Sequence, residues 1–142
     1  MTSPLPVKLQ GGALTEREAV ADALYRAVLA FDHADEDLLR SALTEDITVT
    51  TAGQTSKGLA ELKTAVFDRV SKLITTHFLS NIRVSIEGDS TAIATCSALA
   101  QHVRAGKGFE ASENKLTSGG LYYCELVNGP QISPGWMVTP LS

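Results

Sequence analysis

The spacing of the apolar residues changes once along this chain of 142 residues, near position 75. Before that point apolar residues recur every three or four positions, which is the period of a helix with one buried face. Beyond it, β-branched and apolar residues alternate with polar ones over long stretches, as they do in β-strands. Helices that come first and antiparallel strands that follow predict an α+β fold, with the helices packed on one face of a curved sheet.

Three helices are expected in the first half of the chain. Residues 15–18, Thr-Glu-Arg-Glu, fit a capping box, in which a threonine hydroxyl accepts a hydrogen bond from the first helical turn. Acidic residues at 35–37 favour the positive end of a second helix. The expected elements are a helix at 15–33, a helix at 35–43, a strand at 46–51, a loop at 53–58 and a helix at 59–74.

The second half of the chain predicts an antiparallel sheet. Three long strands are expected, at residues 76–86, 91–104 and 115–127. The turn at residues 87–90 joins the first two as a hairpin. The segment 130–142 holds three prolines, so a last strand can form at most around residues 136–138.

The long strands carry apolar residues at both alternating positions. Ile82, Val84 and Ile86 share one face of the first strand, whereas Leu79 has the opposite parity. Both faces of the sheet are therefore expected to be covered, one by the helices and the other by a second subunit. This pattern predicts a homodimer formed through the outer face of the sheet.

Composition limits the partners of the chain. With 44% apolar and 20% charged residues, we expect one domain at 14–142 after a disordered lead-in at 1–13. The net charge of −4 and the lack of a basic block argue against a nucleic-acid partner. The longest apolar run, residues 27–31, is too short to cross a membrane. No secretory signal is recognisable, and there are two widely spaced cysteines, so a cytoplasmic protein is expected.

Two histidines are the most informative polar residues. His77 opens the first long strand, and His102 lies near the end of the next, at almost the same distance from Asp89 in the turn. Asp32 ends the first helix on the same side as Tyr25, by helical spacing. Both imidazoles can then face one cavity in which a carboxylate orients them for proton transfer. The competing interpretation is that both histidines are surface or interface residues.

No metal and no cofactor are expected. Asp32, His77 and His102 are suitable ligand types, but they lack the close spacing of zinc motifs. Phosphate-binding and nucleophile-elbow motifs are absent from the sequence. Tyr122, on the third long strand, is a candidate to line the cavity, although aromatic residues on strands commonly serve packing.

The order of elements resembles the nuclear-transport-factor-2-like superfamily, which includes SnoaL-like polyketide cyclases and scytalone dehydratase. The likeness spans residues 14–127, and its local matches are FDHADEDLL at 31–39, TTHFLS at 75–80 and AQHVRAG at 100–106. The resemblance implies a cone-shaped α+β barrel. It also implies a site in which Asp32, His77 and His102 act around a small molecule.

The sequence departs from scytalone dehydratase at several positions. The tyrosines that hold the leaving-group side of the substrate in that enzyme fall at Phe31 and near Thr51. An asparagine of the third long strand falls near Gly120, whereas a serine two positions earlier is retained as Ser118. Scytalone itself is therefore not the expected substrate. The proline-rich tail at 130–142 also differs from the last strand of the family. Three explanations remain open: a variation within the family, an exchange of termini between subunits, or an altered carboxyl end of the reading frame.

Two functions remain open at this point. The first is a cofactor-free isomerase, cyclase or dehydratase that acts on a hydrophobic polyketide- or terpenoid-derived metabolite, with His77 and His102 transferring protons. Asp32 would orient one imidazole or bind the activating water, and Ser118 or Tyr122 would donate a hydrogen bond to an enolate. Tyr25 and Thr51 complete the expected substrate contacts. The alternative is a non-catalytic ligand-binding or dimerisation module of the same fold.

Overall fold

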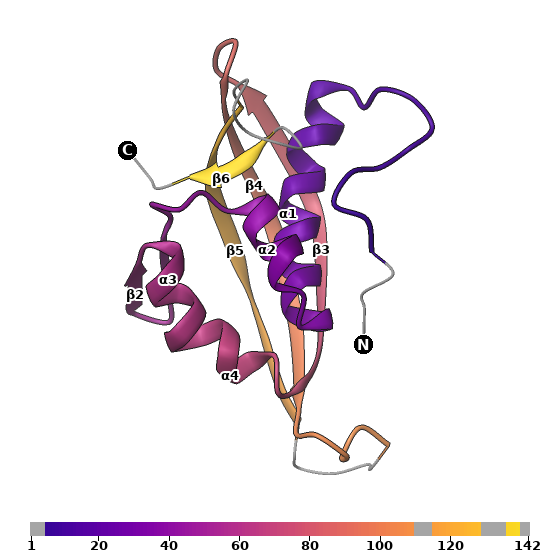
Figure 1. The fold of residues 1–142 in the computed structure, drawn as a ribbon, viewed down its shortest axis with the longest axis vertical. Helices are drawn as coiled ribbons and strands as arrows, with labels where there is room; N and C mark the ends of the chain where they lie inside the picture. Colours follow the sequence, from indigo (N-terminus) through magenta and orange to yellow (C-terminus); the bar gives the residue numbers. More distant parts are fainter. Residues whose placement is uncertain (1–4, 110–114, 129–135, 140–142) are drawn as a thin grey trace.

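The computed structural model describes residues 5–109, 115–128 and 136–139, and within them helices cover one face of a mainly antiparallel sheet (Figure 1). The helices are α1 (Glu16–His33), α2 (Glu36–Ala42), α3 (Leu59–Leu62) and α4 (Asp68–Val70), with a π-helical turn η1 (Lys63–Phe67) between the last two. The strands are β1 (Thr48–Thr51), β2 (Gln54–Lys57), β3 (Ile74–Ile86), β4 (Thr91–Val103), β5 (Lys115–Val127) and β6 (Met137–Thr139). The predicted α+β class is confirmed.

The first helix begins where the capping box predicts. The hydroxyl of Thr15 accepts from the Glu18 amide at 3.2 Å, and the Glu18 carboxylate accepts from the Thr15 amide at 2.7 Å. Ala34, in the left-handed conformation at φ 53°, ends the helix and turns the chain into α2. The side chain of Asp35 caps α2 by accepting from the Leu38 amide at 3.0 Å.

Two sequence predictions in the middle of the chain are wrong. The expected loop at 53–58 contains strand β2, which pairs with β1 through a tight turn at Ala52 and Gly53, both with positive φ. Its residues are almost all polar and exposed, so no apolar alternation marks it as a strand. The third helical stretch ends at Val70 rather than near residue 74, and Ile74 already belongs to β3.

The main sheet has the order β3-β4-β5-β6, with every neighbouring pair antiparallel. In the described residues the sheet is open and does not close into the barrel that the resemblance implies, because β3 and β6 stand at opposite edges. The short strand β6 pairs with Glu125–Val127, at the far end of β5, and its Val138 forms a parallel bridge with Leu43 on the other side. Of the atypical tail predicted at 130–142, residues 136–139 are described, and the remainder lies outside the described residues.

A β-bulge corrects the predicted faces of β3. The register with β4 shifts between Ser80 and Arg83, where Asn81 has a positive φ of 55°. The extra residue reverses the side-chain alternation, so Leu79 and Ile82 both pack against the same core despite their opposite parity. Apolar residues at both odd and even positions of β3 therefore do not show that both faces of the sheet are covered.

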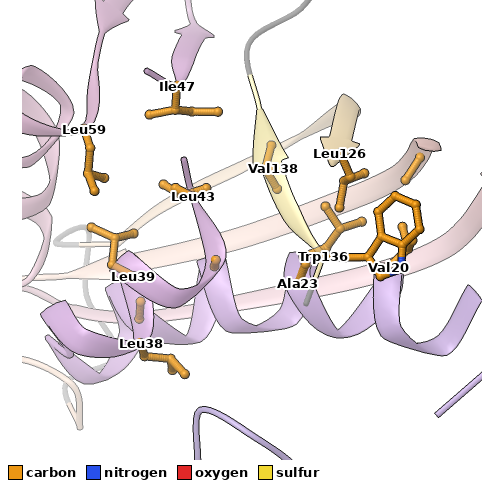
Figure 2. Packing of buried hydrophobic residues seen from close by; sticks show 14 of the residues in the cluster. Val20, Ala23, Leu38, Leu39, Leu43, Ile47, Leu59, Leu126, Trp136 and Val138 are labelled. Carbon is orange, nitrogen blue, oxygen red and sulfur yellow. The ribbon is translucent and has the colours of Figure 1, made fainter. Parts of the chain in front are cut away.

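The core lies between α1, α2 and the inner face of the sheet (Figure 2). Its fully buried side chains include Val20, Leu38, Leu39, Ile47 and Leu126. Trp136 and Val138 join this cluster from β6 and the residue before it, at 3% and 9% exposure. None of the helices in the described part of the chain is both long and apolar enough to cross a membrane.

A buried arginine fastens the C-terminal segment to the helices. Arg26 of α1 is only 4% exposed, and it donates to the Asp22 carboxylate at 2.8 Å. It also donates to the Ser41 carbonyl and hydroxyl, and to the Trp136 carbonyl at 2.9 Å. One guanidinium thus satisfies groups from α1, α2 and the segment that leads into β6.

Replacement of this arginine should loosen the whole arrangement. We expect Arg26→Met to lower the free energy of unfolding by about 3 kcal/mol, because it leaves buried carbonyls and the Asp22 carboxylate without their donor. Urea unfolding followed by circular dichroism measures the change. The control is Arg17→Met, at an exposed position of the same helix, which should cost less than about 0.5 kcal/mol. Equal losses in the two variants would show that the buried contacts contribute nothing particular.

Candidate active site

Three elements bring the predicted polar residues together. Asp32 comes from the C-terminal end of α1, His77 from the start of β3 and His102 from the end of β4. His102 stands opposite Thr75 in the sheet, and His77 stands opposite Ala100. The two histidines are therefore diagonal neighbours on one face. Their rings meet edge to face, with centroids 5.6 Å apart.

The Asp32 carboxylate accepts three hydrogen bonds from β3. Its Oδ1 accepts from the Thr75 hydroxyl at 2.8 Å and lies 2.6 Å from Nδ1 of His77. Its Oδ2 accepts from the backbone amide of His77 at 2.9 Å. That amide lies at the free edge of the sheet, so the carboxylate both satisfies the edge and orients the ring. Asp32 and His77 are nearly buried, with side chains 8% and 11% exposed.

These contacts determine which nitrogen of His77 carries a proton. Burial favours the neutral acid of Asp32, but the hydrogen bonds from the ring and amide of His77 and from Thr75 outweigh it and lower the Asp32 pKa. The carboxylate is therefore ionised at neutral pH and has no proton to donate. Nδ1 of His77 must be the donor, which leaves Nε2 as the basic nitrogen in the neutral ring.

His102 has a different environment. Burial lowers its pKa, and the neighbouring His77 lowers it further, against smaller opposing effects from the Leu116 backbone and Asp32. The ring is therefore neutral at pH 7. Its Nδ1 atom is buried and has no hydrogen-bond partner among the described residues. A buried nitrogen without a partner calls for an explanation, such as a catalytic role or an ordered water.

An aromatic pair closes one side of the site. The rings of Phe31 and Phe67 meet edge to face at 5.2 Å, and Phe31 lies 6.4 Å from the ring of His77. Phe67 is 4% exposed and ends the π-helical turn η1, a distortion that is often found at functional sites. The resemblance places Phe31 where scytalone dehydratase has a tyrosine. In this chain the ring without a hydroxyl forms part of an apolar wall.

The remaining predicted residues lie at various distances from this cluster. Ser118 and Tyr122 share the inner face with the histidines, because Ser118 pairs with Ala100 and Tyr122 pairs with Cys96. Burial raises the pKa of the Tyr122 phenol, which keeps its proton. Thr51 is exposed at the end of β1, in the separate two-stranded sheet.

Tyr25 belongs to another part of the surface. It lines a hollow of about 370 Å³ between α1 and β3, together with Arg17 and Arg83. A second hollow of about 250 Å³ lies beside Arg83 and is lined by residues of β3 and β4. The histidines line neither hollow. Among the residues that the structure describes, no three acidic, histidine or cysteine side chains converge as ligands of a metal ion.

Comparison with known proteins shows the family of this chain. The model of the SnoaL-like domain family matches residues 12–141, nearly the whole chain. The chain belongs to the SnoaL-like family. Within it, the chain is 47% identical over 128 residues to terrestric acid biosynthesis cluster protein E of Penicillium crustosum, a match that covers 89% of this chain and 81% of that protein.

Solved structures confirm the fold of this SnoaL-like chain. A nuclear-transport-factor-2-like protein from Salmonella enterica superposes with a TM-score of 0.72 at 14% identity, over 87% of this chain and 86% of the other. A candidate scytalone dehydratase from Novosphingobium aromaticivorans also gives 0.72, at 19% identity over 88% and 80%. The predicted resemblance in fold is therefore confirmed. At these identities the likeness extends to the fold alone.

Sequence reasoning missed two residues of the SnoaL-like site. Thr75 was passed over, although it has the same alternation parity as His77 and so had to face the same side. Phe67 was passed over because the regular helical spacing expected around it does not include a π-helical turn. The parity of Thr75 was a usable signal, whereas no sequence pattern identified the second residue.

The lowered pKa of His102 should appear in the pH dependence of stability. Below the ordinary histidine pKa of 6.5, the unfolded chain binds a proton at this position more readily than the folded one. The contribution of His102 is thus fully present above that pH and is lost as pH falls. We expect the unfolding free energy of the wild type to fall more steeply between pH 7.5 and 5.5 than that of His102→Gln. Urea unfolding at several pH values measures both slopes.

The matched control for this prediction is His33→Gln. His33 is exposed at the end of α1, outside the cluster. This variant should keep the steep wild-type dependence. A slope in His102→Gln that equals the wild-type slope would contradict the burial effect.

Proposed function

We propose that this SnoaL-like chain is a small cofactor-independent enzyme that isomerises, cyclises or dehydrates a hydrophobic secondary metabolite by proton transfer. The observation that supports it most is the coupled set Asp32–His77–His102, in which a buried carboxylate fixes one imidazole beside a second, neutral one. Such a pair has the acid–base capacity that removal and return of a proton require. The free thiols of Cys96 and Cys124 fit a reducing compartment such as the cytoplasm.

In the proposed reaction, Nε2 of His77 removes a proton from a carbon next to a carbonyl group of the substrate. The electron pair of the broken C–H bond forms a C=C bond, and the π electrons of the carbonyl group move onto its oxygen, which gives an enolate. The positive charge that appears on His77 is stabilised by the Asp32 carboxylate, 2.6 Å from Nδ1. The proton is then passed by His77 and the adjacent His102 to another carbon in an isomerisation, or to a departing hydroxyl, which leaves as water, in a dehydration.

The enolate requires hydrogen-bond donors in a site that excludes water. Candidates on the inner face are the hydroxyl of Ser118 and the phenol of Tyr122, whose raised pKa keeps it protonated at neutral pH. The apolar wall of Phe31 and Phe67 favours an apolar substrate body beside His77. Asp32 serves to orient His77, since both of its oxygens already accept hydrogen bonds from β3.

The comparisons support the substrate class. The Penicillium crustosum relative is named for a terrestric acid biosynthesis cluster, and 47% identity over most of both chains supports a related role in secondary metabolism here. The candidate scytalone dehydratase shares the fold. Proton abstraction next to a carbonyl group is a reaction that such a site can serve on many carbon skeletons.

The test is solvent deuterium exchange. The purified protein is incubated in D2O with a panel of neutral hydrophobic ketones and β-hydroxyketones, and mass spectrometry records deuterium uptake and loss of water. We expect wild-type exchange with at least one compound, and a loss of at least about 100-fold in both His77→Ala and His102→Ala. Loss of water identifies a dehydratase. Uptake without loss of water shows reversible proton removal, and a product in which the proton has moved to another carbon identifies an isomerase.

The variants must remain folded, as judged by circular dichroism, and His33→Ala is the matched control. Full activity in either variant would remove that histidine from the mechanism. Binding of a panel compound without any exchange, unchanged by both substitutions, would favour the alternative of a ligand-binding module.

We further propose that the chain forms a homodimer through the outer face of the sheet. Four large apolar side chains are exposed there: Phe78, Leu99, Leu121 and Tyr123 are 59%, 51%, 74% and 51% exposed. Phe78 is paired directly with Leu99 across β3 and β4, and Leu121 lies on the next strand beside them. A contiguous apolar patch of this kind is typical of a protein interface.

A charge in this patch should separate the subunits. We expect the wild type to have twice the 15.1 kDa mass of one chain in sedimentation equilibrium, and Leu121→Glu to have the mass of one chain. A buried carboxylate without a partner is costly at an interface. Leu9→Glu, at an exposed apolar position outside the sheet, is the control and should remain dimeric. A wild type of single-chain mass, or a dimeric Leu121→Glu, would contradict the proposed interface.

A further inference from the structure

The hollow between α1 and β3 has no part in the proposed reaction. Its volume of about 370 Å³ lies within the range of about 300–1,000 Å³ that small-molecule sites occupy. Arg17, Ala21 and Tyr25 line it from α1 at spacings of four residues, and so share one face of the helix. Residues 82–84 of β3 line it from the sheet. Because Tyr25 lies about 10 Å along the helix from Asp32, the hollow is distinct from the candidate active site.

Part of this hollow is apolar. Ile82 and Val84 are half-buried and pack against the core, and the ring of Tyr25 is 43% exposed. The β-bulge at Asn81 comes directly before this part of β3 and sets the direction of its side chains. Bulges that re-aim side chains are over-represented beside functional sites. The hollow thus offers an aromatic ring and two aliphatic side chains to a bound molecule.

The charged groups of the hollow are not balanced. The side chains of Arg17 and Arg83 border it, and neither makes an ion pair or hydrogen bond within the described part of the chain. The carboxylate among the lining residues belongs to Glu18, which accepts from the Thr15 amide in the capping box. Two guanidinium groups against one carboxylate leave a charge of +1, in a chain whose net charge is −4. The hollow therefore favours a singly charged anion.

A carboxylate with a flat apolar body matches both parts of the hollow. The fork of N–H groups on a guanidinium fits the two oxygens of a carboxylate. A phosphate monoester carries about −1.5 to −2 at neutral pH, which is more than the hollow balances. An aromatic ring attached to the carboxylate would cover the apolar surface of Tyr25, Ile82 and Val84.

We propose that the hollow between α1 and β3 is a binding site for a small aromatic monocarboxylate. Its carboxylate is held by the guanidinium groups of Arg17 and Arg83, and its ring lies against Tyr25 and the apolar residues of β3. This site uses neither His77 nor His102, so the inference is independent of the proposed function.

The probe for this site is 2-naphthoate, and the neutral 2-naphthamide has the same ring system without the charge. Binding is followed through the backbone amide resonances of the labelled full chain. We expect 2-naphthoate to shift the resonances of residues 17–25 and 82–84. It should bind at least about tenfold more tightly than 2-naphthamide, because hydrogen bonds between charged groups are stronger than neutral ones.

Two variants remove one positive charge each. Arg17→Met and Arg83→Met should weaken the binding of 2-naphthoate by at least about tenfold and leave that of 2-naphthamide unchanged. The matched control is Arg104→Met, just beyond the end of β4, which should bind both compounds as the wild type does. All three arginines are exposed. The variants should therefore keep the fold, and their amide spectra report whether they do.

Several results would overturn this assignment. They are a wild type that does not bind 2-naphthoate, equal affinities for the two compounds, or an affinity for 2-naphthoate that either variant leaves unchanged. Resonance shifts centred on His77 and His102 in place of residues 17–25 would also overturn it. None of these results bears on deuterium exchange with ketones, so the proposed function stands or fails separately.

Discussion

The site depends on one carboxylate that joins a helix to a sheet edge. Asp32, at the end of α1, accepts three hydrogen bonds from Thr75 and His77, which both belong to β3. The same contacts satisfy an edge amide, hold the end of the helix against the strand and select the protonated nitrogen of His77. One group therefore positions the helix end and also orients the imidazole, and it does so without any bound molecule.

Much of this arrangement could be predicted from local sequence patterns. The capping box at Thr15 and the long alternating strands gave the correct elements, because hydrogen-bond geometry and side-chain period are local properties. The approach of His77 to His102 followed from counting residues back from the hairpin turn. The count placed them roughly opposite each other, because His77 and His102 lie twelve and thirteen residues from Asp89. They are offset diagonally by two residues, because the bulge at Asn81 adds one residue to that difference of one.

Two kinds of feature could not be predicted: the position of a residue along the helix axis relative to the sheet, and contacts between segments far apart in the sequence. Tyr25 and Asp32 share a side of α1, as expected, but seven residues separate them by about 10 Å along the helix. That distance places Tyr25 beside Ile82, past the bulge, rather than beside the histidines. The contact between Arg26 and Trp136 spans 110 residues, and no periodicity encodes such a pairing.

The bulge at Asn81 divides β3 into two segments, and the side-chain alternation of one segment does not fix that of the other. The segment that carries Thr75 and His77 is in phase with α1 only because one additional residue lies between it and the segment that carries Val84. Deletion of a single codon there would turn His77 toward the outer face while the other segment kept its place. The insertion or deletion of one residue in this strand would therefore change the candidate site as well as the strand pairing.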